Sequence, residues 1–485
     1  MSWLRLLRIL TFLTAALGIV LLSYLGGEWI HNRQVHATLA AFPAIQPSDR
    51  ILVVSPHADD ETLGPGGLIE TAISAGAQVH VVLITNGDGF TRAVRAAFHE
   101  PLPDPQDYVR FAYQRQQETL RALSILGLPS RDVTFLGYPD GGTARMWYDH
   151  WDRNDPYLSP HTRDEYSPYN NSFTPRTPYA GAALVSDLEN IITQFNPTMV
   201  VVPHPGDRHP DHMMAYAFTV YALADLGRED VPLETYLVHR GNWDWPTPQG
   251  LHMDAYLVPP WDLWSIEKTW QSLELTPAQE ELKLRAVDAY RTQMAVIRGF
   301  LLSFVRRNEL FVPRPPVEFS DEPLVPSAGG TGFTGQLVQA DSAKDTIGED
   351  LRGAGDLIGV YMGRDGANLQ FGVETRENAS RSMAYELQLR AFDGQGHVTR
   401  VDLRLVGKSA GFLSLAANSA NVGPVSVQYT GHDVLVSIPA ARLGAFHDIF
   451  ISWAASYHGL VIDRTEWVLV RVGKENPTPS TAKRK

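Results

Sequence analysis

Two short stretches of the chain concentrate residue types that bind metal ions. PHADDE, at residues 56–61, holds one histidine and three carboxylates, and HPGDRHPDH, at residues 204–212, holds three histidines and two aspartates. Carboxylates this close together repel one another, and a divalent cation that accepts carboxylate oxygens and neutral imidazole nitrogens removes the conflict. One stretch rarely supplies enough ligands, so the two stretches together predict one shared metal site.

Each stretch has a simpler explanation when it is taken alone. Aspartates after a strand can cap the next helix, because a carboxylate accepts the unpaired backbone N–H groups of the first turn. HPDH alone is also an ordinary polar loop. The pairing of the two stretches, in this order, favours the metal. The sequence contains no cysteine, so the ligands must be nitrogen and oxygen atoms.

The predicted elements place both stretches at one edge of a sheet. Buried strands are predicted at residues 51–55 and 198–205, where ILVVS and TMVVVPHP run up to the two stretches. Two more strands and three helices alternate around them, at 78–87 and 133–137 and at 64–76, 109–126 and 182–195. This alternation predicts a Rossmann-like, mostly parallel sheet with helices on both faces. Such sheets bind ligands beyond the carboxyl ends of their strands.

The motif PHADDETLGPGGLI, followed by HPDH, resembles the PIG-L/LmbE-like family of zinc-dependent de-N-acetylases, over roughly residues 50–310. The family removes acetyl groups from N-acetylglucosamine-type sugars. The resemblance implies that His57, Asp60 and His212 bind Zn²⁺, which leaves an open position for water. It also implies that Asp59 is the general base and that a protonated His209 acts as acid or stabilises the oxyanion.

Neighbouring residues receive supporting roles. We expect Asp211 to orient His209 or a metal ligand, and Glu61 to do the same. His204 and Asp207 lie upstream of the matching motif and are interpreted as loop or rim residues. Four further residues are candidate substrate contacts: Asp88, Arg115, Glu118 and Asp140. A surface ion pair is the alternative for Arg115 and Glu118, and a turn is the alternative for Asp140.

The first residues predict a membrane anchor. Arg5 and Arg8 precede an uncharged stretch from Ile9 to Gly27, which is about long enough to span a bilayer as a helix. The positive charges on its amino-terminal side place the rest of the protein outside the cytoplasm. A cleaved signal peptide, giving a secreted protein, is the alternative.

The hydrophobic pattern of the sequence changes after a stretch rich in proline, glycine and serine. Alternating apolar and polar runs beyond it predict an antiparallel β-sandwich, which weakly resembles carbohydrate-binding sandwiches of the CBM9/DOMON-like type. Its aromatic residues are either a sugar platform or core: Tyr361, Trp453, Tyr457 and Trp467. The predicted segments are an anchor (1–27), a tether (28–48), the deacetylase domain (49–311), a linker (312–335), the sandwich (336–473) and a disordered tail (474–485). An aromatic insertion at 145–180 is interpreted as either a ligand-facing loop or packing.

The sequence therefore predicts a membrane-anchored, extracytoplasmic zinc deacetylase. Its substrate would be an N-acetylated amino sugar in an envelope glycan or glycolipid. A zinc amidase for a non-sugar amide and a non-catalytic glycan-binding scaffold are the alternatives. A net charge of −13 disfavours nucleic acid as a partner. The first strand is not followed by a G-x-G-x-x-G turn, which disfavours a nicotinamide-binding domain.

Overall fold

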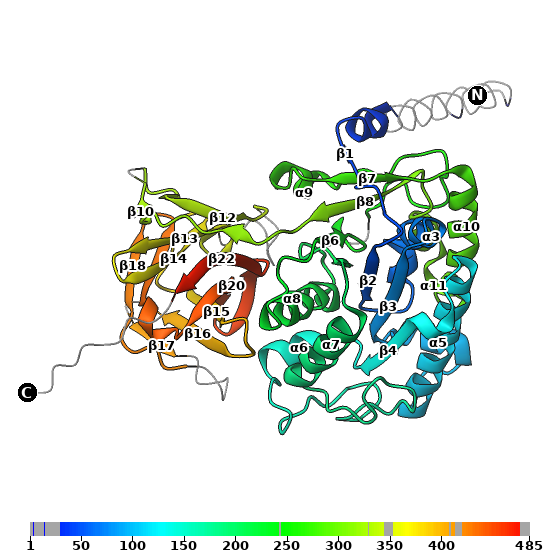
Figure 1. Ribbon diagram of the computed structural model, residues 1–485, viewed down its shortest axis with the longest axis horizontal. Helices are drawn as coiled ribbons and strands as arrows, with labels where there is room; N and C mark the ends of the chain where they lie inside the picture. Colours follow the sequence, from blue (N-terminus) through cyan, green and yellow to red (C-terminus); the bar gives the residue numbers. More distant parts are fainter. Residues whose placement is uncertain are drawn as a thin grey trace, which may run out of the picture.

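The computed structural model describes residues 30–241, 244–327, 329–343, 353–406, 409–412 and 420–475, together with Trp3 and Thr14. These residues form a mixed α/β domain and a second domain made of two packed β-sheets, which lie side by side (Figure 1). The two classes of domain are those predicted from the sequence. Within the described residues, no helix has the length and apolar character needed to cross a membrane. The predicted span at 9–27 lies outside the described residues, apart from Thr14.

An eight-stranded sheet organises the α/β domain. Its strand order is β1-β7-β8-β6-β5-β2-β3-β4, and the five strands from β6 to β4 run parallel. β8 pairs antiparallel with both β6 and β7. The strands are β1 (Ala40–Ala41), β2 (Arg50–Ser55), β3 (Gln78–Thr85), β4 (Val133–Tyr138), β5 (Met199–Pro203), β6 (Leu233–Tyr236), β7 (Gln271–Glu274) and β8 (Asn308–Pro313).

Helices cover both faces of this sheet, which explains why its central strands are continuous apolar runs. Along β2, Ile51 and Val53 belong to one buried cluster, whereas Leu52 and Val54 belong to the other. The first cluster includes α3 (Gly66–Ser74), α5 (Pro105–Ile125), α10 (Pro277–Val287) and α11 (Arg291–Leu302). The second includes α6 (Thr143–Tyr148), α7 (Gly181–Phe195) and α8 (Pro210–Asp225). The described part of the domain also contains α2 (Asp60–Leu63), α4 (Thr91–Phe98) and α9 (Trp261–Ile266).

Two segments that were predicted as connections are ordered parts of the fold. Within the predicted tether at 28–48, residues 30–36 are helical and β1 pairs in parallel with β7. Within the predicted linker at 312–335, β9 (Val317–Glu318) pairs with β22 (Val468–Glu475) of the sandwich, and β10 (Val325–Pro326) pairs with β11 (Phe333–Thr334). Proline and glycine in these segments shape short strands and turns rather than a free tether.

The second domain buries its core between two sheets. One sheet contains β12 (Gln336–Ala340), β13 (Leu357–Asp365), β14 (Asn368–Thr375), β19 (Asp433–Pro439) and β18 (Ser426–Thr430). The other contains β17 (Ser409–Phe412), β16 (Val398–Val406), β15 (Ala384–Phe392), β20 (Phe446–Tyr457), β22 (Val468–Glu475) and β9, with β21 (Leu460–Arg464) paired to β20. Apart from the β9–β22 pair, the pairings are antiparallel, as a sandwich requires.

The sandwich packs on the α/β domain through aromatic side chains. Trp467 lies 5.2 Å from Trp147 between ring centroids, and both are buried. The guanidinium of Arg400 stacks 3.8 Å above the ring of Trp151. These contacts show that much of the aromatic insertion serves packing between domains. They also show that Trp467 is not part of a sugar platform, and Trp453 is fully buried in the sandwich core.

Candidate metal centre

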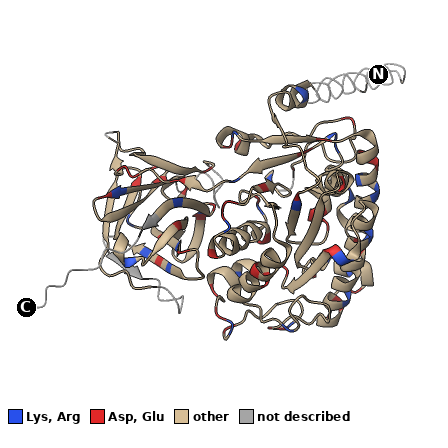
Figure 2. Ribbon diagram, in the orientation of Figure 1, with Lys and Arg blue, Asp and Glu red and all other residues tan. Residues whose placement is uncertain are grey.

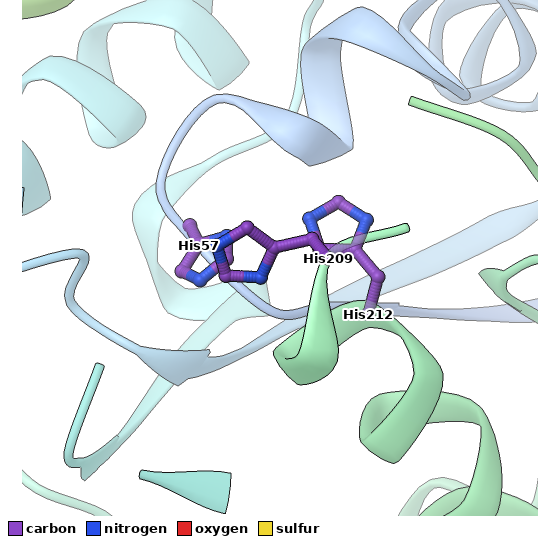
Figure 3. Close-up of side chains that lie close together, drawn as sticks. All are labelled: His57, His209 and His212. Atoms are coloured by element: carbon purple, nitrogen blue, oxygen red, sulfur yellow. The ribbon is translucent and has the colours of Figure 1, made fainter. Parts of the chain in front are cut away.

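The two histidine-rich stretches meet beyond the carboxyl ends of β2 and β5. His57 lies in the loop after β2, and His209 and His212 lie at the start of α8; their rings are close together in Figure 3. Nitrogen atoms of these three histidines lie within 4.8 Å of one another. The parallel sheet thus brings together side chains that are far apart in the sequence.

Asp60 links the two stretches at the atomic level. Its Oδ2 atom is 3.0 Å from His57 Nδ1 and 3.0 Å from His212 Nε2. Two ligands of a tetrahedral zinc ion, each at about 2.0–2.1 Å, are themselves roughly 3.3 Å apart. Burial raises the pKa of Asp60, but the imidazoles of His212 and His57 more than offset this and hold it well below its ordinary value.

The surroundings of His212 support a metal at this point. This residue is fully buried, and neither of its ring nitrogens makes a hydrogen bond of acceptable geometry within the described part of the chain. Its Nε2 atom nevertheless faces the carboxylate of Asp60. A buried nitrogen without a hydrogen bond is costly, and a cation between the two groups would satisfy both. The residues His57, Asp60 and His212 therefore fit a divalent ion.

A buried carboxylate lies behind each of the two candidate histidine ligands. Asp211 Oδ2 is 3.1 Å from His57 Nε2, and Asp207 Oδ2 is 3.1 Å from His212 Nδ1. In each imidazole these nitrogens are the ones opposite Asp60. Carboxylates in this position fix the tautomer and orientation of a metal-binding histidine. The interpretation of Asp207 as a rim residue was therefore wrong, because it is buried against a candidate ligand.

Both supporting carboxylates are held by backbone and side-chain donors. Asp211 accepts hydrogen bonds from the N–H groups of Gly141 and Thr143, at 2.7 and 3.2 Å, and from the Thr143 hydroxyl. Asp207 accepts hydrogen bonds from the N–H groups of His209, Val238 and His239. Each carboxylate is therefore fixed before any ion binds.

A pocket opens beside the candidate centre, and its lining includes His57, Asp59 and Asp60. Asp59 has a strained backbone conformation. Its φ angle is 128°, which non-glycine residues rarely adopt, and such strain concentrates at functional sites. One carboxylate oxygen is 3.3 Å from Arg115 Nη2. Burial, opposed by Arg115, raises the pKa of Asp59 well above its ordinary value. A carboxylate with a raised pKa is suited to accept a proton near neutral pH.

His209 presents one ring nitrogen to the pocket. Its Nδ1 atom accepts a hydrogen bond of 3.2 Å from the N–H group of Asp211, so the proton of the neutral ring is on Nε2. Burial and the neighbouring His57 lower the pKa of His209 to about 3. The expectation of a protonated His209 is thus corrected to a neutral imidazole that donates from Nε2.

Comparison with known proteins identifies the part of the chain that carries both motifs. Residues 52–223 match the family described as GlcNAc-PI de-N-acetylase, or PIG-L. They are a PIG-L family domain. This confirms the family predicted from the two motifs.

The curated relatives share one name, 1D-myo-inositol 2-acetamido-2-deoxy-alpha-D-glucopyranoside deacetylase. The protein of Tsukamurella paurometabola is 30% identical over 199 residues, which are 40% of this chain and 61% of that relative. The protein of Mycolicibacterium vanbaalenii is 29% identical over 303 residues, covering 58% and 92% of the two chains. Among solved structures, N,N′-diacetylchitobiose deacetylase from Pyrococcus horikoshii is 19% identical, with a TM-score of 0.35 over 56% of this chain and 88% of that one.

Of the four candidate substrate contacts, two line the pocket of the PIG-L domain. Asp140 accepts a hydrogen bond of 2.7 Å from Gly89 N–H and lies 3.3 Å from His57 Nε2. Arg115 lines the pocket beside Asp59 and donates hydrogen bonds to the carbonyls of Ala58 and Gly87. A side chain at residue 87 would collide with Arg115, and φ there is +63°, so this turn needs glycine. Arg115 therefore positions Asp59 and the loop around it.

The other two candidates are buried supports rather than substrate contacts. Asp88 accepts a hydrogen bond of 2.9 Å from the hydroxyl of Tyr169, and so fixes the aromatic insertion. Glu118 accepts hydrogen bonds from the N–H and hydroxyl groups of Thr292, in the first turn of α11. The alternative of a surface ion pair between Arg115 and Glu118 is also wrong, because both side chains are buried.

The remaining residues of the two motifs have clear positions. Glu61 accepts a hydrogen bond of 3.1 Å from Asp59 N–H and one from the hydroxyl of Tyr290, and burial raises its pKa to about 7. It therefore holds the strained turn rather than a ligand. His204 is buried away from the centre, stacked on Trp270 and in contact with Arg314.

Two pocket histidines were missed in the sequence. His239 follows β6, and His161 belongs to the aromatic insertion; both line the pocket. Neither lies in a motif. The rule that polar residues follow parallel strands would have marked His239 if β6, with its short mixed sequence LETY, had been recognised.

Proposed function

We propose that this protein is a zinc-dependent hydrolase that removes the acetyl group from N-acetylglucosamine-type amino sugars. The observation that carries the proposal is the contact of Asp60 Oδ2 with both His57 and His212, beside the strained Asp59. Support comes from the PIG-L family domain and from relatives named as deacetylases of an N-acetylated glucosaminyl inositol.

The pocket suits a polar ring that carries a small apolar group. Its volume is about 290 Å³, and the candidate ligands and Asp59 line one part of it. An apolar part is formed by Leu63, Phe90, Ile297 and Phe300. A sugar can form hydrogen bonds with Asp140 and His161 while its acetamido group reaches the metal side.

The ion would be held by His57, Asp60 and His212. When bound, zinc supplies the Lewis acidity that lowers the pKa of water and polarises the amide carbonyl. Asp59 takes the proton of the attacking water, because its raised pKa favours the protonated form. Arg115 holds Asp59 in place for this transfer. The protonated Asp59 then gives its proton to the leaving nitrogen, and acetate and the free amine result.

His209 stabilises the charge that develops on the carbonyl oxygen. Its Nε2–H group is available because Nδ1 accepts the backbone hydrogen bond from Asp211. A donor held in place costs no reorganisation during the reaction, which is why such groups lower barriers strongly. Asp211 thus has two roles: its backbone N–H group orients His209, and its carboxylate contacts the candidate ligand His57.

We further propose that the catalytic domain lies outside the cytoplasm, anchored through residues 9–27, with an envelope glycan or glycolipid as substrate. Support comes from Arg5 and Arg8, which precede this uncharged stretch.

The acidic net charge of −13 disfavours a nucleic-acid partner. Acidic and basic residues are interspersed over both domains in the view of Figure 2. Glycan binding by the sandwich stays a prediction. Protease protection in spheroplasts, whose outer envelope has been removed, tests the location: digestion is expected, and protection until the cytoplasmic membrane is permeabilised would contradict it.

Acetate release from a panel of substrates tests the chemistry. The panel contains N-acetylglucosamine-inositol conjugates, chitooligosaccharides, N-acetylated glycolipids and simple N-acetyl amines without a sugar. We expect release from at least one sugar and its loss on adding a chelator. Release only from non-sugar amides would assign the site to another class of amide, and no release from any compound would contradict a deacetylase.

A further inference from the structure

A separate group of side chains with metal-binding donors lies where the two domains meet. Glu229 follows α8 in the α/β domain, whereas His447 and Asp448 belong to β20 of the sandwich. One donor atom from each of these residues lies within 4.8 Å of the other two. The three residues lie outside both motifs, and the group shares no residue with the candidate metal centre. The proposed deacetylation therefore does not use this donor set.

An irregularity in β20 brings two neighbouring side chains together. Successive side chains of a regular strand point to opposite faces of the sheet. The register between β20 and β22 shifts between Phe446 and Asp448, and His447 Nδ1 lies only 2.6 Å from Asp448 Oδ2. Such a shift can turn a side chain toward a new direction. Glycine at residue 394 makes room for the imidazole, because a Cβ atom there would lie 2.3 Å from His447 Nε2.

The carboxylates of this group lack hydrogen-bond donors. Asp448 is fully buried, and among the residues that the structure describes neither of its oxygen atoms has a hydrogen bond of acceptable geometry. The short contact with His447 Nδ1 does not supply one. The Oε2 atom of Glu229 is buried without a hydrogen bond as well. A buried carboxylate without donors is costly, and a cation bound between these oxygen atoms would remove that cost.

The guanidinium of Arg471 lies near the group but does not take the place of such a cation. It is 3.7 Å from Glu229 Oε1 and 3.9 Å from Asp448 Oδ1, which is too far for hydrogen bonds. It lies closer to Glu318 Oε1, at 3.4 Å. Its positive charge also repels a metal ion. Binding at this group should therefore be weaker than at the candidate metal centre, so that the first equivalent of Zn²⁺ fills the centre.

We propose that Glu229, His447 and Asp448 form a second metal site, which binds a divalent transition-metal ion and links the α/β domain to the sandwich. One imidazole nitrogen and two carboxylates are donors that suit Zn²⁺ and related ions. The side chains of Glu229 and His447 are 15% and 18% exposed, so an ion can enter from solvent. The site takes no part in the proposed chemistry, and the inference does not depend on it.

Zn²⁺ binding by full-length variants separates the two sites. His57→Ala combined with His212→Ala removes two candidate ligands of the metal centre and leaves the interface group intact. Asp448→Asn removes a charge from the interface group at nearly constant volume. Glu229→Gln makes the corresponding change on the other domain, at a partly exposed site, and serves if Asp448→Asn does not fold. Far-ultraviolet circular dichroism and thermal unfolding of the metal-free proteins check the fold.

Glu318→Gln is the matched control. Glu318 also contacts Arg471, but it does not belong to the donor group. A substitution that acted only through Arg471 would therefore have the same effect at Glu318 as at Asp448. Acetate release is measured on the same proteins, because Asp448→Asn should keep the wild-type rate.

The number of Zn²⁺ ions per chain is the readout, measured by equilibrium dialysis followed by metal analysis. We expect two ions in the wild type and in Glu318→Gln, and one in the double histidine variant. Adding Asp448→Asn or Glu229→Gln should remove one ion from each background. A wild type that binds a single ion, or a second ion that both carboxylate variants retain, would overturn the inference and leave the proposed function standing. Loss of acetate release in the double histidine variant alone concerns the proposed function.

Discussion

Replacing Asp59 by asparagine removes the proposed general base and little else. Asparagine has nearly the same volume as aspartate, and it tolerates positive φ angles better than most residues do. This matters because φ at residue 59 is 128°. Arg115 keeps its hydrogen bonds to the carbonyls of Ala58 and Gly87, so the loss of its contact with Asp59 leaves the guanidinium anchored. We therefore expect the Asp59→Asn protein to fold.

The expected loss of activity follows from the role of Asp59. A positioned general base contributes about 10²–10⁴-fold to the rate, which corresponds to about 3–5 kcal/mol of transition-state stabilisation. Metal content should not change, because the side chain in contact with both histidines is that of Asp60. Asp60→Asn is the matched control: it makes the same chemical change one residue away and should lose the ion together with the activity.

The assay follows acetate release under single-turnover and steady-state conditions, with metal content measured on the same samples. A drop in kcat of about 10²–10⁴-fold at unchanged metal content is expected for Asp59→Asn. The reasoning would be refuted by activity within a few-fold of the wild type. It would also be refuted if the two variants lost metal equally.

Three further predictions concern support and stability. Asp207→Asn should weaken metal binding by about 10–100-fold in chelator competition, because it removes the charge that orients His212; unchanged affinity would contradict this. Glu234 is buried, and burial raises its pKa from 4.5 to about 7. Between these two pH values, the folded state therefore keeps a proton on Glu234 that the unfolded state has lost. Its contribution to the free energy of unfolding is therefore present below pH 4.5 and lost as pH rises through about 7; urea unfolding should show this slope in the wild type and a shallower one in Glu234→Gln. Trp467→Ala should destabilise the protein by about 3–5 kcal/mol in the same assay, whereas Leu460→Ala, at a site that is 58% exposed, should cost far less. Equal effects of these two substitutions would argue against an energetically important domain interface.

The parts of the candidate centre that are local in sequence could be predicted. The strands that end at residues 55 and 203 were recognised by their apolar runs, and each is followed by candidate ligands. The parallel sheet brings the two stretches together, because neighbouring parallel strands have their carboxyl ends at the same edge. Asp207 and His239 were misread or missed, since their roles arise only from contacts made across the folded edge.

Elements with two buried faces were the harder part of the fold. The sequence of β20 does not indicate a strand, because it lacks the alternation of a half-exposed strand. Ile449 and Ile451 face the sandwich core, while Phe450 between them packs with the α/β domain. The same interface buries Trp467, which sequence alone could not distinguish from an exposed sugar platform. Glu118 was misassigned for a related reason, since its partner Thr292 lies on a distant helix.

Metal reconstitution followed by acetate release tests whether one zinc ion in this centre is required for deacetylation. The protein is stripped with a chelator, zinc is added back in fractions of one equivalent, and acetate release from the best N-acetylglucosamine-type substrate is measured at each step. We expect no activity without metal and a linear recovery that saturates at one zinc per chain. Full activity in the stripped protein, or one bound zinc per chain with no release from any N-acetylated sugar, would contradict it.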